Sequence, residues 1–132
     1  MNKVNLKELT KAEEQVMQAI WKIEKGFANE IFSNVNEMRR TREKNVEADV
    51  AYNTVLTVVR ILEQKGFVAH ETFNRSNRYY PLVSREEYMQ QQLKGFAARY
   101  FGSSPRALVS FLVDKKEVSL EDLELITKEL ES

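Results

Sequence analysis

Residues 51–67 read AYNTVLTVVRILEQKGF, and the two sides of this stretch differ in chemistry. On a helix with about 3.6 residues per turn, one side collects the aliphatic side chains of Val55, Val58, Val59 and Leu62. The other side collects Asn53, Thr57, Arg60 and Gln64. We therefore predict an amphipathic helix from about Val50 to Lys65, which ends at Gly66 in a left-handed conformation.

The polar side of this helix holds residue types that a helix selected only for stability would avoid. Asn and Thr are weak helix formers, and Thr loses side-chain freedom in a helix. Short amide and hydroxyl groups do suit DNA, because Asn can pair with adenine and Thr can contact a thymine methyl group or a phosphate. We interpret Asn53 and Thr57 as base-reading candidates, and Thr54 and Arg60 as phosphate-binding candidates. An ordinary solvated helix surface is the alternative interpretation.

Two further helices are predicted before this stretch. Thr10 and Glu13 have the spacing of a capping box, which opens a helix that should end at Gly26. A shorter helix is expected at Asn29–Glu37. The next residues, 38–49, read MRRTREKNVEAD and lack an aliphatic stripe, so they form either a solvated loop or a helical extension.

The same segment contains the densest basic cluster of the chain, formed by Arg39, Arg40, Arg42 and Lys44. Acidic residues are interspersed among these cations, which favours a solvated surface. Contact with the DNA backbone is the second interpretation of this cluster.

A β-hairpin is predicted directly after the helix of residues 50–65. FVAHETF (67–73) alternates enough to be one strand, and RYYPLV (78–83) is the other. Residues 74–77 are of types that favour turns. Pro81 has no backbone N–H, so we expect the second strand to lie at a sheet edge.

Basic and amide side chains gather around the turn of this hairpin. We interpret Arg75, Asn77 and Arg78 as contacts to phosphate groups or to the minor groove of DNA. A charged hairpin tip that prevents aggregation through the strand edge is the alternative.

Three amphipathic helices are predicted after the hairpin. Ser84 and Glu87 form a second capping-box pair, which opens a helix to about Phe101. GSSP at 102–105 breaks that helix, and Ser119 caps the last one. Since about fifty residues of amphipathic helix bury too little apolar surface to fold alone, we expect a second copy of the chain to cover them. The apolar positions assigned to this dimer interface are Met89, Leu93, Phe96, Tyr100, Leu108, Phe111, Leu112, Leu123 and Ile126.

The order of three helices and a hairpin is that of a winged helix-turn-helix domain, in which the third helix reads DNA and the hairpin is the wing. The sequence therefore predicts a mainly α protein with a small β-hairpin. Residues 1–83 would form the winged helix-turn-helix DNA-binding domain, and residues 84–132 a three-helix dimerisation region.

Composition argues against several other classes of protein. The chain has no cysteine and a single histidine, His70, so neither disulfides nor a metal site are expected. Its four glycines form no phosphate-binding loop, and no catalytic motif is present, so we expect neither an enzyme nor a cofactor. Without a long apolar run or a signal-peptide pattern, the expected location is the cytoplasm, without membrane insertion.

The net charge of zero is unusual for a protein that binds nucleic acid. Binding to DNA would then depend on local clusters of basic residues rather than on total charge. A winged helix that serves as a protein-interaction module, without sequence-specific DNA binding, is therefore the competing hypothesis.

Four segments in the same order along nearly the whole chain carry a resemblance to a known family. They are LTKAEEQVMQAIW (9–21), NTVLTVVRILEQKGFV (53–68), RYYPLVSREEY (78–88) and LVSFLVDKKEVS (108–119). These segments resemble the penicillinase-repressor family of winged-helix transcriptional regulators. The resemblance implies a homodimeric repressor that binds a palindromic operator in double-stranded DNA, interlocks through its C-terminal helices, and controls resistance or stress genes.

The resemblance also implies a route of induction and shows two departures from the family pattern. In the best-known systems a membrane sensor protease triggers cleavage of the repressor within its dimerisation region. The Asn-Phe pair that is cut there aligns with Phe111 and Leu112, so cleavage at this bond is in question. Residues 38–49 are longer than the family's connection into the recognition helix.

Overall fold

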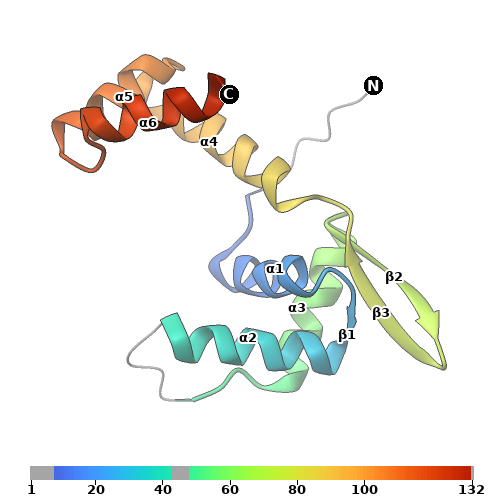
Figure 1. Ribbon diagram of the computed structural model, residues 1–132. Coiled ribbons are helices and arrows are strands. Elements are labelled where there is room, and N and C mark those ends of the chain that lie inside the picture. Colours follow the sequence, from blue (N-terminus) through green and yellow to red (C-terminus); the bar gives the residue numbers. More distant parts are fainter. Residues whose placement is uncertain (1–7, 43–47, 132) are drawn as a thin grey trace. The chain divides into compact units, whose positions relative to one another are not determined.

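The computed structural model describes residues 8–42 and 48–131, which form six α-helices and three β-strands (Figure 1). In chain order these elements are α1 (Lys11–Ile23), β1 (Gly26–Phe27), α2 (Ala28–Arg42), α3 (Tyr52–Gln64), β2 (Val68–Phe73), β3 (Ser76–Pro81), α4 (Arg85–Phe101), α5 (Pro105–Asp114) and α6 (Leu120–Glu131). The chain divides into two compact units, Met1–Met89 and Gln90–Ser132.

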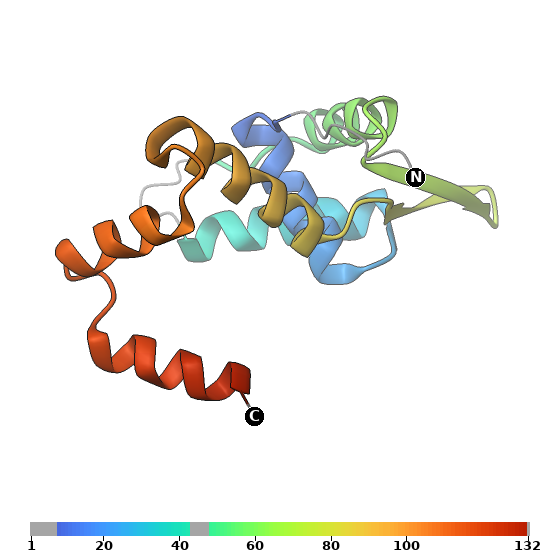
Figure 2. The same ribbon diagram turned by 90° about the horizontal axis from the view of Figure 1, so that it is seen from above.

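The first unit contains three helices and a β-hairpin that projects beyond them in both Figure 1 and Figure 2. Its element order is that of a winged helix-turn-helix domain, with α3 as the recognition helix and the β2–β3 hairpin as the wing. Helices α4–α6 complete the chain. The predicted fold class, a winged helix-turn-helix domain followed by C-terminal helices, is confirmed.

The core of the first unit lies between the three helices and the base of the hairpin. Its fully buried apolar side chains come from the three helices and from the residues that lead into the hairpin, among them Met17, Ile20, Ile31, Val59, Leu62 and Phe67. Burial of one such side chain stabilises the fold by about 1.5–3 kcal/mol. This core fixes which side of each helix remains available for contact with a ligand.

Helix α1 begins as predicted, and its end differs in detail. The Thr10 hydroxyl accepts a hydrogen bond from Glu13 N at 3.2 Å, and Glu13 Oε1 accepts one from Thr10 N at 3.0 Å, which confirms the capping box. The helix ends at Ile23, close to the expected end before Gly26, but the residue with positive φ at this end is Glu24, with φ 68°, and Gly26 itself opens β1. A Cβ at Gly26 would lie 2.7 Å from Ile23 Cδ1, so this glycine permits close packing.

Helix α2 is longer than the predicted helix at Asn29–Glu37. It continues to Arg42, so residues 38–42 belong to the helical extension rather than to a loop. Residues 43–47 lie outside the described part of the chain. Asn36 is buried beside Ile31 and Val35, which the predicted apolar pattern did not require.

Helix α3 confirms the prediction from residues 51–67. Val55, Val59 and Leu62 are buried, while Val58 is half-buried. Gly66 has φ 86°, a conformation that glycine adopts without steric cost. Phe67 N donates to Leu62 O at 2.9 Å across this glycine, which is the bond of a Schellman motif. The chain therefore turns directly from the recognition helix into the wing.

The sheet has three strands in the order β1–β3–β2, and both pairings are antiparallel. The expectation that Pro81 restricts its strand to an edge is wrong, since β3 is the central strand. Strand β1 pairs only with Arg78 and Tyr79, so Pro81 lies beyond the end of that pairing. Its missing N–H therefore costs no ladder hydrogen bond to β1.

The turn of the hairpin is shorter than the expected residues 74–77. Phe73 pairs with Ser76, which leaves Asn74 and Arg75 as a two-residue connection. Both have positive φ, 49° and 67°, as a type I′ turn requires. Ser76 and Asn77 therefore belong to β3.

The second unit comprises most of α4 together with α5 and α6. Ser119 caps α6 as expected, since its Oγ accepts from Asp122 N at 3.0 Å, and Ser104 caps α5, since its Oγ accepts from Ala107 N at 3.1 Å. The division between the units follows Met89, beyond the predicted boundary at residue 83, because Tyr88 in the first turns of α4 is buried in the first unit. The Tyr88 hydroxyl accepts a hydrogen bond from Leu9 N at 3.0 Å.

Candidate nucleic-acid interface

The exposed side of α3 carries the polar stripe that the sequence assigned to DNA contact. Its four members, Asn53, Thr57, Arg60 and Gln64, are all exposed, and so is the neighbouring phosphate-binding candidate Thr54. The buried side of the helix is held in the core by Val55, Val59 and Leu62. The packing of the helix therefore presents the stripe to solvent as one continuous polar surface.

One hydroxyl of this stripe is already committed to the helix itself. Thr57 Oγ1 donates a hydrogen bond to Asn53 O at 2.8 Å. This bond fixes the direction of the hydroxyl hydrogen, so the γ-methyl group and an oxygen lone pair remain for an external partner. Thr57 is therefore suited to contact a thymine methyl group or to accept a hydrogen bond.

The amino-terminal end of α3 is open to an anionic partner. Its cap residue, Ala51, makes no side-chain hydrogen bond to the first turn, and that turn contains no acidic residue. The first N–H groups of a helix lack partners within the helix, and the helix dipole favours a negative charge beside them. A DNA phosphate is the kind of group that satisfies such an end.

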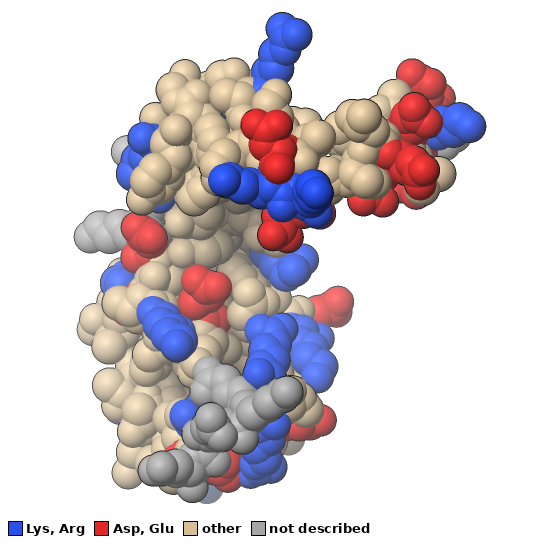
Figure 3. Space-filling model, turned by 90° about the vertical axis from the view of Figure 1, so that its left-hand side faces the viewer, with Lys and Arg blue, Asp and Glu red and all other residues tan. Residues whose placement is uncertain are grey.

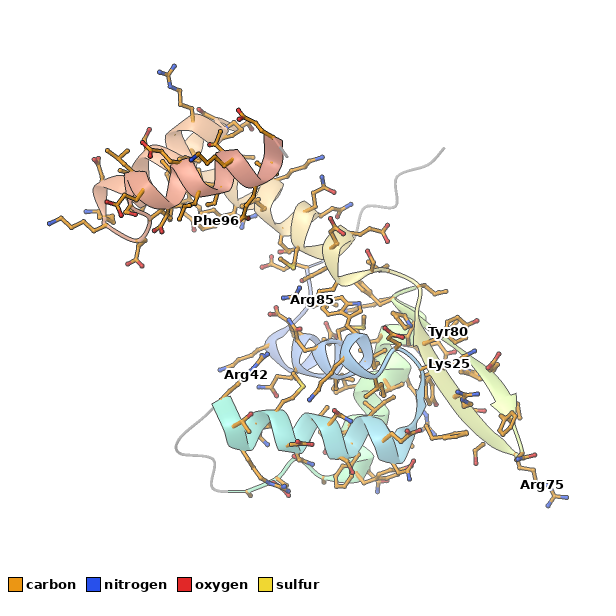
Figure 4. All side chains as sticks on the ribbon, viewed as in Figure 1. Lys25, Arg42, Arg75, Tyr80, Arg85 and Phe96 are labelled. Carbon is orange, nitrogen blue, oxygen red and sulfur yellow. The ribbon has the colours of Figure 1, made fainter. Side chains whose placement is uncertain are left out.

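The three predicted wing residues occupy different environments. Arg75 is exposed in the turn and points away from the protein at the tip of the hairpin (Figure 4). Asn77 is exposed on β3. Arg78 is half-buried, and its guanidinium carbon lies 5.6 Å from the ring centroid of Phe27 and 5.5 Å from that of Phe73. Stacking therefore ties Arg78 to the body of the wing, and its contact with DNA stays a prediction.

A groove of about 660 Å³ runs between α3 and the wing and brings several predicted residues together. Arg60 lines it from α3, and Asn74 and Asn77 line it from the hairpin. Aromatic and aliphatic side chains form other parts of its wall, among them Phe27, Leu56, Phe73 and Tyr79. Hydrogen-bond donors from α3 and from the hairpin therefore face the same groove, which suits contact with the phosphate backbone of DNA.

Most residues that line this groove were not assigned to DNA contact from the sequence, and Asn29 and Tyr52 are two polar examples. Asn29 lies at the start of α2, and Tyr52 at the start of α3. Tyr52 is exposed and packs edge-on against Phe32, with ring centroids 5.6 Å apart. The signal for Tyr52 was its place at the open end of the recognition helix, whereas Asn29 becomes a neighbour of α3 only through the tertiary fold.

The basic cluster of α2 lies at the opposite end of that helix from the wing, as the position of Arg42 in Figure 4 shows. Arg39 and Arg40 bind residues of their own chain, Ala48 and Asp49. Lys44 lies outside the described residues. On the side of the molecule drawn in Figure 3, Lys and Arg side chains are interspersed with Asp and Glu. These contacts favour the solvated-surface interpretation over contact with DNA.

The residues assigned to the dimer interface are incompletely covered within the chain. Met89, Leu93, Phe96, Tyr100, Phe111 and Ile126 are exposed, and Leu108, Leu112 and Leu123 are half-buried. Four further apolar side chains, which were not assigned to the interface, are also exposed, namely Val109, Leu120, Leu125 and Leu130. Neither α5 nor α6 contains a buried residue. The apolar surface of the second unit is therefore available to another molecule.

The Phe111–Leu112 bond, which the resemblance aligned with the cleaved bond of the family, lies within α5. Phe111 is exposed and packs edge-on against Phe101, with ring centroids 5.5 Å apart. Leu112 is half-buried. Cleavage at this position stays a prediction.

Other kinds of site find little support in residues 8–42 and 48–131. Within these ranges, no three His, Asp or Glu side chains lie together as a metal site requires. His70 contacts Glu63 through Nδ1 and packs against the Tyr79 ring at 5.6 Å between centroids, which agrees with the expected packing role. No helix in the described ranges has the length and apolar content to cross a membrane.

Comparison with known proteins gives a consistent result. Residues 9–132 match the family model described as penicillinase repressor. The chain is similar to the methicillin resistance regulatory proteins MecI of Mammaliicoccus sciuri and of Staphylococcus aureus (strain N315), with 26% identity over 117 residues in each case. Each alignment covers 89% of this chain and 88% of the relative.

Proposed function

This chain belongs to the penicillinase repressor family, whose members are transcriptional repressors and not enzymes, and from this premise we propose that it binds a palindromic operator as a homodimer. In each half-site, α3 lies in the major groove and the β2–β3 hairpin contacts the neighbouring backbone. The observation that carries the proposal is the exposed stripe Asn53–Thr57–Arg60, whose member Arg60 lines a groove together with Asn74 and Asn77 of the wing.

This face makes two kinds of contact with DNA, to base edges and to phosphate groups. Asn53 and Thr57 project from the exposed side of α3 and read base edges, because an amide donates and accepts and a threonine offers a methyl group. Thr54 and Arg60 bind phosphate, and so does Arg75 at the tip of the wing. Phosphate contacts set the position of the protein on the duplex, and base contacts set the sequence that it selects.

Dimerisation supplies the two-fold symmetry of the complex. A single winged helix makes few contacts with a half-site, so two linked copies gain affinity through effective concentration. The second unit exposes large apolar side chains on all three of its helices, including Tyr100 with 68% and Leu130 with 82% of their surface exposed. A second copy of the same unit covers such a surface through an isologous interface.

The proposal is tested by selecting duplexes from a random-sequence pool with the purified full chain. We expect enrichment of one two-fold symmetric sequence, bound by two chains per duplex. Affinity for this duplex should exceed that for a scrambled duplex by about 10³-fold or more and should fall steeply with salt concentration. Equal binding of selected and scrambled duplexes at physiological salt would overturn the proposal, and binding without a salt slope would favour a protein-interaction module.

We further propose that the regulated genes belong to the resistance or stress class and that a membrane sensor protease system relieves repression. The MecI relatives support this proposal, since their names describe methicillin resistance regulators. The test is mass spectrometry of the protein from cells before and after treatment with a cell-wall antibiotic. Fragments from a cut within the dimerisation region, at the Phe111–Leu112 bond or at another bond, are expected after treatment, and an intact chain under conditions that derepress the target genes would contradict this route.

A further inference from the structure

The recognition helix begins without a local device that fixes its first residue. Ala51 occupies the cap position, and its methyl side chain makes no hydrogen bond to the helix. A helix end without a side-chain cap frays more easily. The position of the first turn of α3 therefore depends on tertiary contacts, which are the packing of Tyr52 on Phe32 and the contacts of the preceding residues, Ala48, Asp49 and Val50.

The side-chain amide of Asn36, on α2, binds both the backbone N–H and the backbone C=O of Val50. Its Oδ1 accepts a hydrogen bond from Val50 N at 2.8 Å, and its Nδ2 donates to Val50 O at 3.1 Å. Nδ2 also lies 3.3 Å from Phe32 O one turn earlier. With 2% of its surface exposed, Asn36 is one of the two buried polar side chains among the described residues. A carboxamide is suited to this role because it both donates and accepts.

Two arginines of α2 hold the residues immediately before Val50. Arg39 Nη1 donates to Ala48 O at 3.2 Å. Arg40 binds Asp49 through two nitrogens, with Nε at 3.2 Å from Oδ1 and Nη2 against Oδ2. Hydrogen bonding from Arg40 lowers the pKa of the Asp49 carboxyl group, so Asp49 is charged at neutral pH. Exposed pairs of this kind contribute little stability each, but the bidentate geometry restricts the direction of the chain.

The three side chains act from one side of the same helix. Positions 36, 39 and 40 are spaced by three and four residues, which places them next to one another along α2. Their partners are the consecutive residues 48, 49 and 50, which run beside α2 toward α3 (Figure 1). Helix α2 thus holds three successive residues of the chain that enters the recognition helix.

We propose that Asn36, supported by Arg39 and Arg40, is a positioning residue for DNA reading. It fixes the start of α3 on α2, and this inference rests on the proposed function of α3. The clamp of Asn36, Arg39 and Arg40 keeps the start of the recognition helix in register with α2. The arginines of the basic cluster then serve the protein itself rather than the DNA backbone.

The residues held by the clamp lie close in the sequence to the residues proposed to read bases. Asn53 lies three residues after Val50, and Thr57 lies one turn further along the exposed side. Base-reading side chains must be held within about 0.5 Å of their productive geometry by the groups around them. Loss of the clamp should therefore reduce discrimination between DNA sequences more than it reduces non-specific binding to phosphate.

The test uses the full chain with Asn36→Leu, which keeps a side chain of similar size and removes the three hydrogen bonds. The measured quantity is the ratio of affinities for the selected duplex and a scrambled duplex, and we expect it to fall about tenfold or more. Amide hydrogen exchange at Val50 should accelerate in the same variant, which a purely global loss of stability would not confine to this site.

Two matched controls lie on the same helix. Asn34→Ala removes an amide that binds only Glu30 O within α2, at 3.1 Å, and should leave the ratio unchanged. Val35→Ala shortens a buried core side chain and lowers stability. The fraction of this variant that is folded should still show the unchanged ratio of affinities for the two duplexes. An unchanged ratio in Asn36→Leu, with normal discrimination by the unmodified chain, would overturn the clamp and leave the proposed function intact. Failure of the unmodified chain to discriminate would overturn the proposed function first.

A second variant keeps the clamp testable if Asn36→Leu does not fold. Arg40→Ala removes an exposed side chain, so the fold should remain intact. The affinity ratio should fall about two- to fivefold, the range expected for loss of an exposed ion pair. An unchanged ratio in Arg40→Ala, together with an unfolded Asn36→Leu, would assign these contacts to stability alone and overturn the proposal.

Discussion

At the scale of the residue, Thr57 tests the assignment of base reading. Its hydroxyl already binds Asn53 O, and its methyl group remains available on the exposed side of α3. Thr57→Ala should relax selectivity at one base pair of each half-site, at a cost of about 1–3 kcal/mol of discrimination. Gln64→Ala, on the same side at the other end of the helix, is the control and should leave selectivity unchanged. Competition binding with single-base variants of the selected duplex measures both.

Arg75 tests a different kind of contact. Arg75→Ala should weaken binding to all duplexes by a similar factor and lower the salt slope by about one unit, because one phosphate contact is lost. Alanine carries a Cβ as arginine does, so the positive φ of residue 75 strains the backbone of the variant about as much as that of the unmodified chain. Anisotropy titrations at several salt concentrations provide the measurement. A change of selectivity without a change of slope would show that Arg75 reads bases instead.

Glu13 links stability to pH. Its burial favours a raised pKa, but hydrogen bonds from Lys65 and Thr10 and the charge of Lys65 outweigh burial, so the pKa of Glu13 lies below its ordinary value. Lys65 Nζ lies 2.7 Å from Oε1 and 2.8 Å from Oε2. Because the folded-state pKa is the lower one, this stabilisation is present above the pKa of the unfolded chain and is lost as pH falls through the folded value.

The corresponding variant is Glu13→Gln, with exposed Glu14→Gln as its control. Glu13→Gln should lower the free energy of unfolding at pH 7 by about 1–3 kcal/mol, and the difference from the unmodified chain should shrink below about pH 4. Urea unfolding at pH 7 and at pH 3 measures this. An equal difference at both pH values would show that the carboxylate charge does not contribute.

At the scale of the element, the sequence predicted those features that depend on interactions between residues close together in the chain. The apolar spacing of residues 51–67 and the capping boxes at Thr10 and Ser84 depend on residues within one or two turns, and the structure confirms these features. The exposed stripe of α3 could be predicted for the same reason, since the opposite side of the helix had to be buried.

Features that depend on tertiary pairing were not accessible from the sequence. Strand β1 has two residues and exists because β3 lies beside it, so its presence reversed the expectation for Pro81. The role of Gly26 depends on the approach of the Ile23 side chain rather than on a helix stop. The partners of Asn36, Arg39 and Arg40 lie nine to fourteen residues away, which explains why the cluster of residues 39–44 was interpreted without them.

The end of α3 provides a prediction at this scale. Gly66 has φ 86°, and a Cβ there would meet no atom within 4 Å. Gly66→Ala should therefore destabilise the first unit through backbone strain alone, by about 1–2 kcal/mol. Thermal unfolding of the two proteins measures the difference. A neutral substitution would contradict the Schellman end as the link between recognition helix and wing.

At the scale of the whole molecule, the proposed dimerisation through the second unit would allow a chain of zero net charge to bind DNA tightly. Two weak half-site contacts become one strong interaction when the copies are joined. Leu93→Glu places a charge in the exposed apolar stripe of α4 in both copies and should raise the dimer dissociation constant about 10²- to 10⁴-fold, as expected when each copy loses one buried leucine. Sedimentation equilibrium measures this constant, with Lys94→Gln as the control on the same helix.

Operator binding should weaken together with dimerisation in Leu93→Glu. A variant that remains dimeric would move the interface away from this stripe. A variant that is monomeric and yet binds the selected duplex with full affinity would show that the two-fold arrangement is not needed for binding.

The most direct test of the central claim is a photo-crosslink from position 57 of α3 to the selected duplex. With a photoreactive side chain in place of Thr57, we expect crosslinks to major-groove bases at two symmetric positions, separated by about 10–10.5 base pairs or a multiple of that spacing. Crosslinks at one position only, at phosphates throughout the duplex, or equally on a scrambled duplex would contradict the account in which α3 reads a palindromic operator.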